Sequence, residues 1–457
     1  MEYNVSKLID LLEDDPKILS YKIRDQSLWM ILRQVMIQFI LNNSLTEVKK
    51  PNRSIIKLLN TLNALFHSVI FPPQKIKKGK VLFIANSLKE TNEGYINHIT
   101  DPLFSYIKRD SYVFYEGKNT IKKQFSCLER SLFWTELKIN FRSKWKSLKK
   151  EELVILKKFL MFFNDKLKEN NISYIIISET FLIKRINLYF LKYNDYKDIL
   201  RIIKPKLIMA EGLCYSRSYI TLAAKELSIK TGELQHGSID QSSYPYNVGA
   251  GLAYQKSIRA YYPNYFFSFG AYWQSFMNIP SESIPIGFSF LEGYSRKENT
   301  LSKTKTILVI SSSLNSKEII RYTLELNKLA KTRKVKIIFR PSPRELPNLK
   351  EVYGRLMSKE NIDIDANLSI YDSFLNCNTV VGDYSTVLFE AINFNKSIYL
   401  FNTKSTRMFY TKLFLKLEMN QLETVFESNF ESFSKIKQEI WCPNPDKKLA
   451  SFISKSL

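Results

Sequence analysis

The stretch KPKLIMAEGLCYSRSYITLAAKELSIKTGELQHG, residues 204–237, contains one complete strand–helix–strand pattern. The apolar run within 205–212 is short and continuous, which is typical of a strand buried in a parallel sheet. Residues 215–229 carry an amphipathic stripe, as a helix that covers such a sheet does. A second short strand follows and breaks into a polar turn at His236. The pattern predicts an α/β domain built on a parallel sheet.

The same alternation recurs elsewhere in the first half of the chain. Further strands are predicted within 78–87, 110–116, 171–179, 265–277 and 282–290. The lysine-rich region 120–170 is predicted to be helical. The first 72 residues are also predicted as helices, because their apolar positions are periodic and the pair Pro72–Pro73 then interrupts the pattern.

The polar, charged segment 292–305 is the best linker in the chain, and a second α/β unit follows it. Strands are predicted within 305–313, 334–345, 361–366 and 379–402, with helices at 316–333 and 369–378. The chain therefore divides into a helical N-terminal segment (1–72), a first α/β domain (73–291), a second α/β domain (306–430) and a C-terminal helix that packs back toward the first domain (431–457).

The net charge of the chain indicates which kinds of partner it can bind. The 457 residues carry 68 Lys and Arg against 44 Asp and Glu, a formal charge of +24. Such an excess favours polyanions or anionic surfaces. Lysines cluster within 49–57, 75–80 and 143–158, which predicts contact with an anionic membrane face, although a solvated lysine-rich surface explains the clusters equally well. No nucleic-acid-binding signature accompanies them, so we expect no nucleic-acid partner.

The remaining features predict a cytoplasmic protein. The four cysteines lie far apart without CxxC spacing, so neither a disulfide framework nor a zinc site is expected. The first residues lack the basic and apolar regions of a signal peptide. The most apolar early run, 28–41, is interrupted by Arg33, Gln34 and Gln38, and is too short and polar to span a bilayer.

The turn after the strand at 230–235 is the leading site candidate in the first domain. Ligands in α/β proteins bind outside the carboxyl ends of the strands, and His236 lies at such an end. Its imidazole can act as a general base. Glu211 ends the preceding strand and can orient His236 or replace it, or can serve only as a helix N-terminal charge. On the acceptor side we add four residues from this turn and from the loop after the first strand: Gln235, Gly237, Glu93 and His98.

The second domain supplies candidates for binding a phosphate. Asp383, Ser385 and Thr386 precede a predicted helix, where hydroxyls and free backbone N–H groups make an anion site, although Ser385 or Thr386 can equally be an ordinary helix cap. Arg340 ends a neighbouring strand and can pair with phosphate through two hydrogen bonds. Ser311 and Ser312 end the first strand of this domain and add hydroxyl groups.

These motifs resemble those of bacterial GT-B glycosyltransferases. The QHG loop (235–237), the RPSP segment (340–343), GDYSTVLFEA (382–391) and the early YKIRDQSLWMILRQ (21–34) are similar to the capsule and lipopolysaccharide biosynthesis proteins and, in general design, to the CDP-glycerol glycerophosphotransferases. The resemblance implies two Rossmann-like domains facing each other across a cleft that contains the HG loop. It also implies that Glu390 holds the ribose hydroxyls of the donor.

One residue departs from the family pattern. The family's R-P-H-P histidine is Ser342 here, which can offer a donor phosphate only a neutral hydrogen bond. The departure argues against activity of the teichoic-acid type.

We therefore expect a metal-independent glycosyltransferase without a cofactor. It would move a sugar from a nucleotide-sugar donor to a surface polysaccharide or a lipid-linked glycan, peripherally at the inner face of the cell membrane. No D-x-D pair or His/Asp/Cys cluster predicts a metal. A CDP-polyol phosphotransferase, a nucleotide-sugar epimerase and a non-catalytic glycan-assembly protein also fit the sequence.

Overall fold

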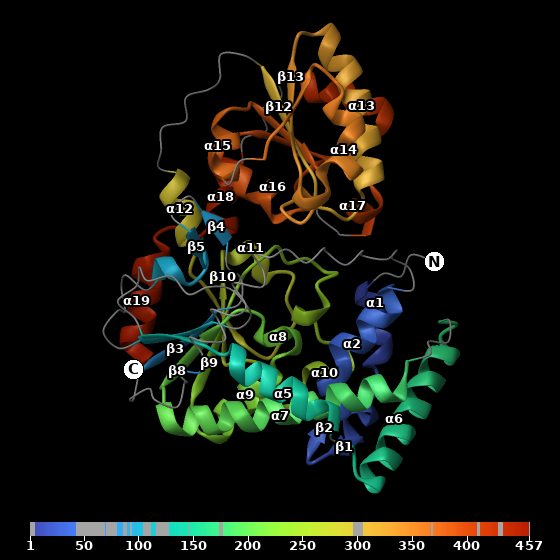
Figure 1. The fold of residues 1–457 in the computed structure, drawn as a ribbon, viewed down its shortest axis with the longest axis vertical. Coiled ribbons are helices and arrows are strands. Elements are labelled where there is room, and N and C mark those ends of the chain that lie inside the picture. The colour runs from blue at the N-terminus through green and yellow to red at the C-terminus, as the bar shows by residue number, and fades with distance from the viewer. Residues whose placement is uncertain are drawn as a thin grey trace.

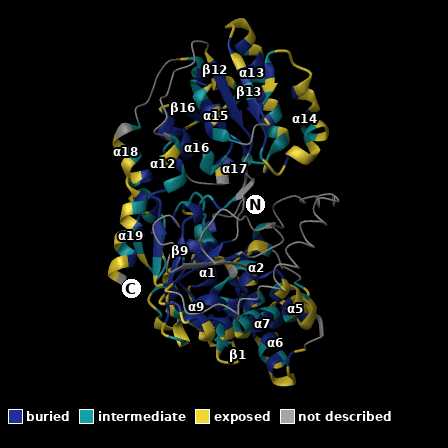
Figure 2. Cartoon of the chain, turned by 60° about the vertical axis from the view of Figure 1, so that its left-hand side comes forward, coloured by how far each residue is buried: buried dark blue, intermediate teal, exposed yellow. Residues whose placement is uncertain are grey.

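The chain forms two α/β domains (Figure 1). The structure, a computed structural model, describes residues 5–42, 69, 80–85, 89–91, 94–103, 111–115, 128–145, 147–172, 177–295, 305–366, 369–408, 412–427 and 433–456. Each domain is built on one parallel sheet, whose central strands are buried (Figure 2). The predicted α/β fold with two parallel sheets is confirmed.

The first domain contains a seven-stranded sheet in the order β11-β10-β9-β8-β3-β6-β7. Its strands are β3 (Val81–Ala85), β6 (Ser111–Tyr115), β7 (Leu128–Ser131), β8 (Leu207–Ala210), β9 (Lys230–Leu234), β10 (Tyr265–Ser268) and β11 (Glu282–Pro285). Its helices are α5 (Phe133–Trp145), α6 (Lys150–Glu169), α7 (Glu179–Ile203), α8 (Leu213–Ser216), α9 (Ser218–Glu226), α10 (Ala250–Ala253), α11 (Ala271–Gln274) and α12 (Ser289–Ser295). A small antiparallel hairpin, β4 (Lys89–Thr91) and β5 (Gly94–Ile96), follows β3.

One predicted helical region of this domain differs from the structure, and one predicted strand is described only in part. The prediction of a helical region over 120–170 is wrong at β7, which pairs with β6 at the sheet edge. An edge strand of sequence LERS lacks the continuous apolar run that identifies central strands. Residues 173–176 of the strand predicted within 171–179 lie outside the described residues, and the described residues on either side of them are not in a strand.

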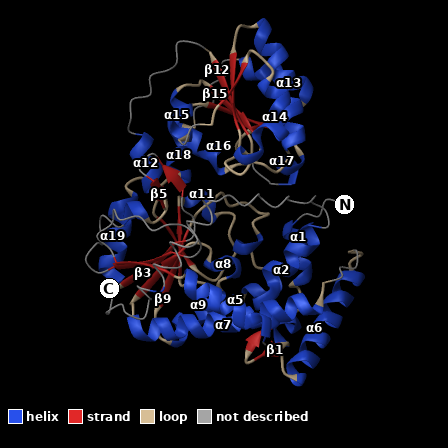
Figure 3. Ribbon diagram, viewed as in Figure 1, coloured by secondary structure: helices blue, strands red, loops and turns tan. Residues whose placement is uncertain are grey.

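The second domain contains a six-stranded parallel sheet in the order β14-β13-β12-β15-β16-β17. Its strands are β12 (Thr306–Ile310), β13 (Lys336–Arg340), β14 (Ile362–Ile364), β15 (Thr379–Gly382), β16 (Ser397–Phe401) and β17 (Leu415–Leu417). Helices lie on both sides of the strands (Figure 3) and are α13 (Ser316–Thr332), α14 (Leu349–Met357), α15 (Ile370–Leu375), α16 (Thr386–Ala391) and α17 (Lys404–Met408). The order reverses between β12 and β15, and ligands of open α/β sheets bind outside the strand ends at such a reversal.

The N-terminal segment packs into the core of the first domain. It contains α1 (Val5–Leu12), a hairpin of β1 (Lys22–Ile23) and β2 (Gln26–Ser27), and α2 (Leu28–Asn42). Glu13, fully buried, pairs with Arg33 at 2.6 Å and accepts hydrogen bonds from Trp29 Nε1 and Gly249 N. These contacts tie α1 and α2 to the segment that follows the His236 turn.

Arg33 completes this attachment. Its two terminal nitrogens donate to the carbonyl oxygens of Tyr244 and Asn247, at 2.7 and 2.5 Å. The pair Glu13–Arg33 therefore holds residues 244–249 from both the backbone N–H and the backbone C=O side.

The C-terminal segment joins the two domains. It contains α18 (Ser434–Ile440) and α19 (Pro445–Ser456). Trp441 donates from Nε1 to the carbonyl of Phe389 in the second domain, and Trp273 of the first domain donates to the carbonyl of Ile440. Further along, the ring of Phe452 packs 4.9 Å from that of Phe267 on β10. The chain thus crosses back to the first sheet. None of the helices in the described part of the chain is long and apolar enough to cross a bilayer.

Candidate active site at the domain boundary

Two strand-end loops meet where the domains touch. The backbone N–H of Ser238, two residues after His236, donates to Oγ1 of Thr386 at 2.9 Å. The phenol of Tyr384 donates to Oδ2 of Asp240 at 2.6 Å. The His236 loop of the first domain and the 383–386 loop of the second are therefore in direct contact.

His236 is half-buried in this contact region. Its ring lies 5.4 Å from the ring of Tyr215 on α8. The Nδ1 atom of the ring is buried. Burial lowers the pKa of the imidazole, and the nearby carboxylate of Glu233 opposes that effect in part. The side chain is therefore neutral at physiological pH, which is the form that accepts a proton.

The other first-domain candidates are held by local contacts. Glu211 is buried and accepts a hydrogen bond from Nδ2 of Asn97 at 2.6 Å. Gln235 bridges the loop, since its side chain accepts from Phe269 N and donates to the carbonyl of Gly237. A Cβ added to Gly237 would lie 3.7 Å from Thr386 Oγ1, an ordinary contact, so crowding does not demand a glycine there.

Two acceptor-side candidates come from the loop after β3. His98 is half-buried in the turn that follows β5, and its ring lies 5.8 Å from that of Phe288, just beyond β11. Glu93 lies outside the described residues. Asn97 was not predicted, although it fixes both Glu211 and its own turn by accepting from the N–H groups of Ile99 and Thr100.

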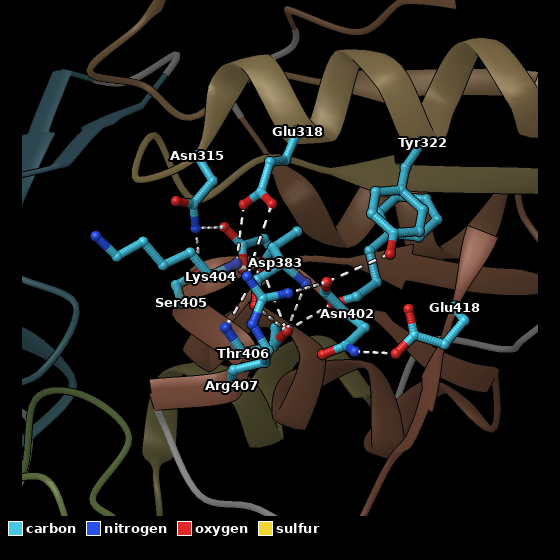
Figure 4. Close-up of polar contacts among 12 residues, drawn as sticks. Asn315, Glu318, Tyr322, Asp383, Asn402, Lys404, Ser405, Thr406, Arg407 and Glu418 are labelled. Carbon is cyan, nitrogen blue, oxygen red and sulfur yellow. Dashed lines mark hydrogen bonds and ion pairs between the residues drawn. The ribbon is translucent and has the colours of Figure 1, made fainter. Parts of the chain in front are cut away.

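Asp383 organises the second half of the site (Figure 4). The fully buried carboxylate accepts hydrogen bonds from residues that follow three strands: Ser312 and Asn315 after β12, Tyr384 N after β15, and Thr403 and Ser405 after β16. A buried charge needs such a complete set of donors. Asp383 thus fixes the loop that presents Ser385 and Thr386, and Ser385 accepts from Val387 N as the cap of α16.

The remaining donor-side candidates have partners within the domain. Arg340 donates to Asp365 at 2.9 Å and to Ser373 at 3.1 Å. Glu390 accepts from the phenol of Tyr371 at 2.7 Å. Ser311 pairs with Tyr353, and Ser342 contributes its backbone N–H to Glu345. The charge of Arg340 is therefore already balanced by Asp365, which reduces what it can offer a phosphate.

Two cations at the end of β16 were not predicted. Lys404 and Arg407 belong to α17, which follows the buried strand SIYLF. Arg407 is exposed, donates to the carbonyl of Asn402 and forms an ion pair with Glu318 at 4.0 Å. The Lys404 side chain extends away from Asp383 (Figure 4). A basic segment directly after a buried strand is the signal that sequence reasoning could have used.

Within the described ranges, no group of three or more His, Cys, Asp and Glu side chains is arranged to hold a metal ion.

Similar proteins are found only among solved structures. No family model and no curated protein matches the chain. The UDP-GlcNAc 2-epimerase of Methanocaldococcus jannaschii matches with a TM-score of 0.48 and 12% identity, over 82% of this chain and 99% of that chain. The α,α-trehalose 6-phosphate synthase of Burkholderia multivorans matches with a TM-score of 0.47 and 9% identity, over 83% and 96%. The UDP-GlcNAc 2-epimerase of Neisseria meningitidis, bound to UDP-GlcNAc, gives 0.45 and 14%, over 82% and 99%.

Proposed function

We propose that the chain is an enzyme that uses a nucleotide sugar and transfers the sugar to a surface-polysaccharide or lipid-linked glycan acceptor. The observation that supports it most is the contact of the His236 loop with the Tyr384–Thr386 loop. A proton acceptor from one domain thereby lies beside hydroxyls and backbone N–H groups from the other. Transfer of a sugar needs both a base for the acceptor hydroxyl and hydrogen-bond donors for the leaving phosphate.

The proposed chemistry assigns one step to each domain. Neutral His236 takes the proton of the acceptor hydroxyl as its oxygen forms a bond to the anomeric carbon. The bond from that carbon to the nucleotide phosphate breaks, and the phosphate leaves with the electron pair. Ser385 and Thr386 hydrogen-bond the leaving phosphate, while Lys404 and Arg407 supply positive charge near it. Glu390 is proposed for the ribose hydroxyls.

The contact between the domains places a condition on donor binding. The Thr386 hydroxyl accepts from Ser238 N and donates to Ser238 Oγ, so its only proton is already used. A phosphate can take the proton of Thr386 only when this contact with Ser238 opens. Donor binding is therefore coupled to a change at the domain boundary.

A nucleotide screen tests the proposal. Purified protein is heated with CMP, CDP, UDP or GDP, and we expect one diphosphate to raise the melting temperature, because a ligand at 100 times its Kd stabilises the native state by about 2.7 kcal/mol. The matching nucleotide sugars are then incubated with glycan acceptors. Failure of every nucleotide to raise the melting temperature contradicts the proposal and favours a glycan-binding protein.

The same assays distinguish a glycosyltransferase from an epimerase and from a polyol-phosphate transferase. Conversion of the nucleotide sugar to its epimer without an acceptor would identify an epimerase. Release of CMP from a CDP-polyol would identify a polyol-phosphate transferase.

A further inference from the structure

Glu233 is a buried carboxylate three residues before His236. It lies on β9 with none of its surface exposed. Its two oxygens accept hydrogen bonds from Cys214 N at 2.6 Å and from the phenol of Tyr246 at 2.8 Å. Glu233 therefore joins β9 to α8 and to the 3-10 turn Tyr244–Tyr246.

Both hydrogen-bond partners of Glu233 connect it to the imidazole of His236. Cys214 is followed on α8 by Tyr215, whose ring lies 5.4 Å from that of His236. The ring of Tyr246 packs edge-on against Tyr215 at 5.5 Å. One carboxylate thus holds Tyr246 directly and Tyr215 through the backbone of the preceding residue, Cys214.

The N-terminal segment holds the same two elements from outside. Gln34 on α2 donates to the carbonyl of Cys214 at 3.0 Å, and Arg33 donates to the carbonyl of Tyr244. Because α8 and the 244–246 turn are held at several points, the Tyr215 ring has a defined place against the imidazole.

Charged groups face His236 from several elements. Glu233 is on β9, and Arg217, beyond α8, opposes its effect on the imidazole. The pair Tyr384–Asp240 closes the side toward the second domain. Burial, together with Glu233, raises the pKa of Tyr246 well above its usual value, so the phenol stays protonated and remains a donor to Glu233.

We propose that Glu233 is a positioning residue for His236: it sets the orientation of the imidazole through Tyr215 and Tyr246 and stabilises the imidazolium formed when the base takes its proton. This inference rests on the proposed role of His236 as the base. A carboxylate can do both, because its hydrogen bonds hold the neighbouring residues in place and its negative charge favours the positively charged imidazolium.

Histidine NMR tests the inference without any substrate. The chain has three histidines, and the signal missing from His236→Gln identifies His236. In Glu233→Gln we expect the midpoint of the His236 titration to fall by about 0.5–1 pH unit, since the carboxylate favours the charged imidazole. Glu325→Gln removes an exposed carboxylate of the second domain and is the control; its midpoint should stay at the wild-type value. Equal midpoints in wild type and Glu233→Gln overturn the inference.

A second variant covers the case in which Glu233→Gln does not fold. Tyr215→Leu leaves both hydrogen bonds of Glu233 in place but removes the ring against His236. The C2–H chemical shift of neutral His236 should then change, and an unchanged shift overturns the positioning role. The nucleotide screen on the same samples reports the proposed function separately, because it does not depend on the His236 titration.

Discussion

The phenol of Tyr384 donates to the carboxylate of Asp240 at 2.6 Å and so connects a loop of the second domain to a loop of the first. Burial raises the pKa of Tyr384 well above its usual value, and Asp240 adds to the shift, so the donor proton is retained at physiological pH. Asp240 itself is held by Ser242 and Ser243, which makes it a fixed acceptor. The two domains therefore meet through a defined polar contact beside His236.

Loss of the hydrogen bond between Tyr384 and Asp240 should weaken the contact between the two domains. A hydrogen bond to a charged group is worth about 1.5–3 kcal/mol, so Tyr384→Phe should shift the nucleotide-free protein toward more open arrangements. Small-angle scattering should report a larger radius of gyration. Tyr254→Phe is the control, because Tyr254 is 92% exposed and takes no part in this contact. An identical scattering curve for Tyr384→Phe would show that the other contacts between the domains hold them without this hydrogen bond.

His236→Gln should abolish sugar transfer while leaving nucleotide-induced stabilisation intact, because the imidazole serves the acceptor and not the donor. In the wild-type enzyme the lowered pKa of His236 sets the acid limb of kcat/KM. The rate should stay level as pH falls through 6.5, the ordinary value for histidine, and decline only below it. Transfer by His236→Gln at the wild-type rate would instead make Glu211 the candidate base, with Glu211→Gln as the next test.

Glu13→Gln should destabilise the protein by about 3–5 kcal/mol, because it leaves the buried guanidinium of Arg33 without its counter-charge. The free energy of unfolding from urea titration measures this. Glu325→Gln breaks an exposed pair with Lys328 and should change the stability by no more than about 0.5 kcal/mol. Similar losses in the two variants would mean that Glu13 contributes no more than a surface charge does.

Gly287→Ala should detach the C-terminal segment from the first domain. Gly287 has φ of +94°, and a Cβ there would lie 2.1 Å from the carbonyl oxygen of Cys442, too close for any side chain. We expect a loss of several kcal/mol, reported by a lower melting temperature and faster proteolysis near residue 442. Gly354→Ala, where nothing lies within 4 Å of the added carbon, is the control and should stabilise α14 by about 0.5–1 kcal/mol.

Binding to anionic vesicles should depend on salt. The net charge of +24 predicts flotation with phosphatidylglycerol vesicles at low ionic strength. Raising the salt to 1 M shortens the screening length to about 3 Å and should release the protein. Neutral phosphatidylcholine vesicles are the control. Flotation that survives high salt would indicate insertion of apolar side chains rather than binding through the lysine clusters. Of these clusters, 49–57 and most of 75–80 lie outside the described residues.

Much of the fold was predictable because local sequence carries its signal. The apolar runs of β3, β8 and β12 identify central parallel strands, since both faces of such strands are covered. Glycine after β10 and β11 marks the turns correctly. The edge strand β7 has only one neighbouring strand, and its sequence LERS contains no continuous apolar run.

The candidate site was predictable only in its positions along the chain. Parallel strands bring their carboxyl ends to one edge, so His236 and Asp383 were both expected at sheet edges. The hydrogen-bond and ion-pair partners of the site residues could not be predicted from the sequence. Arg340 is neutralised by Asp365, 25 residues away, and Asp383 is surrounded by donors from three separate loops.

The sequence by itself determined the alternation of strands and helices, the division into two α/β domains and the strand ends at which polar residues gather. Only the tertiary structure decided which of those polar residues face each other: Thr386 with Ser238, Tyr384 with Asp240, and Glu13 with Arg33. The physical reason is that periodicity records burial along one element, whereas a hydrogen bond or ion pair depends on where two distant elements meet.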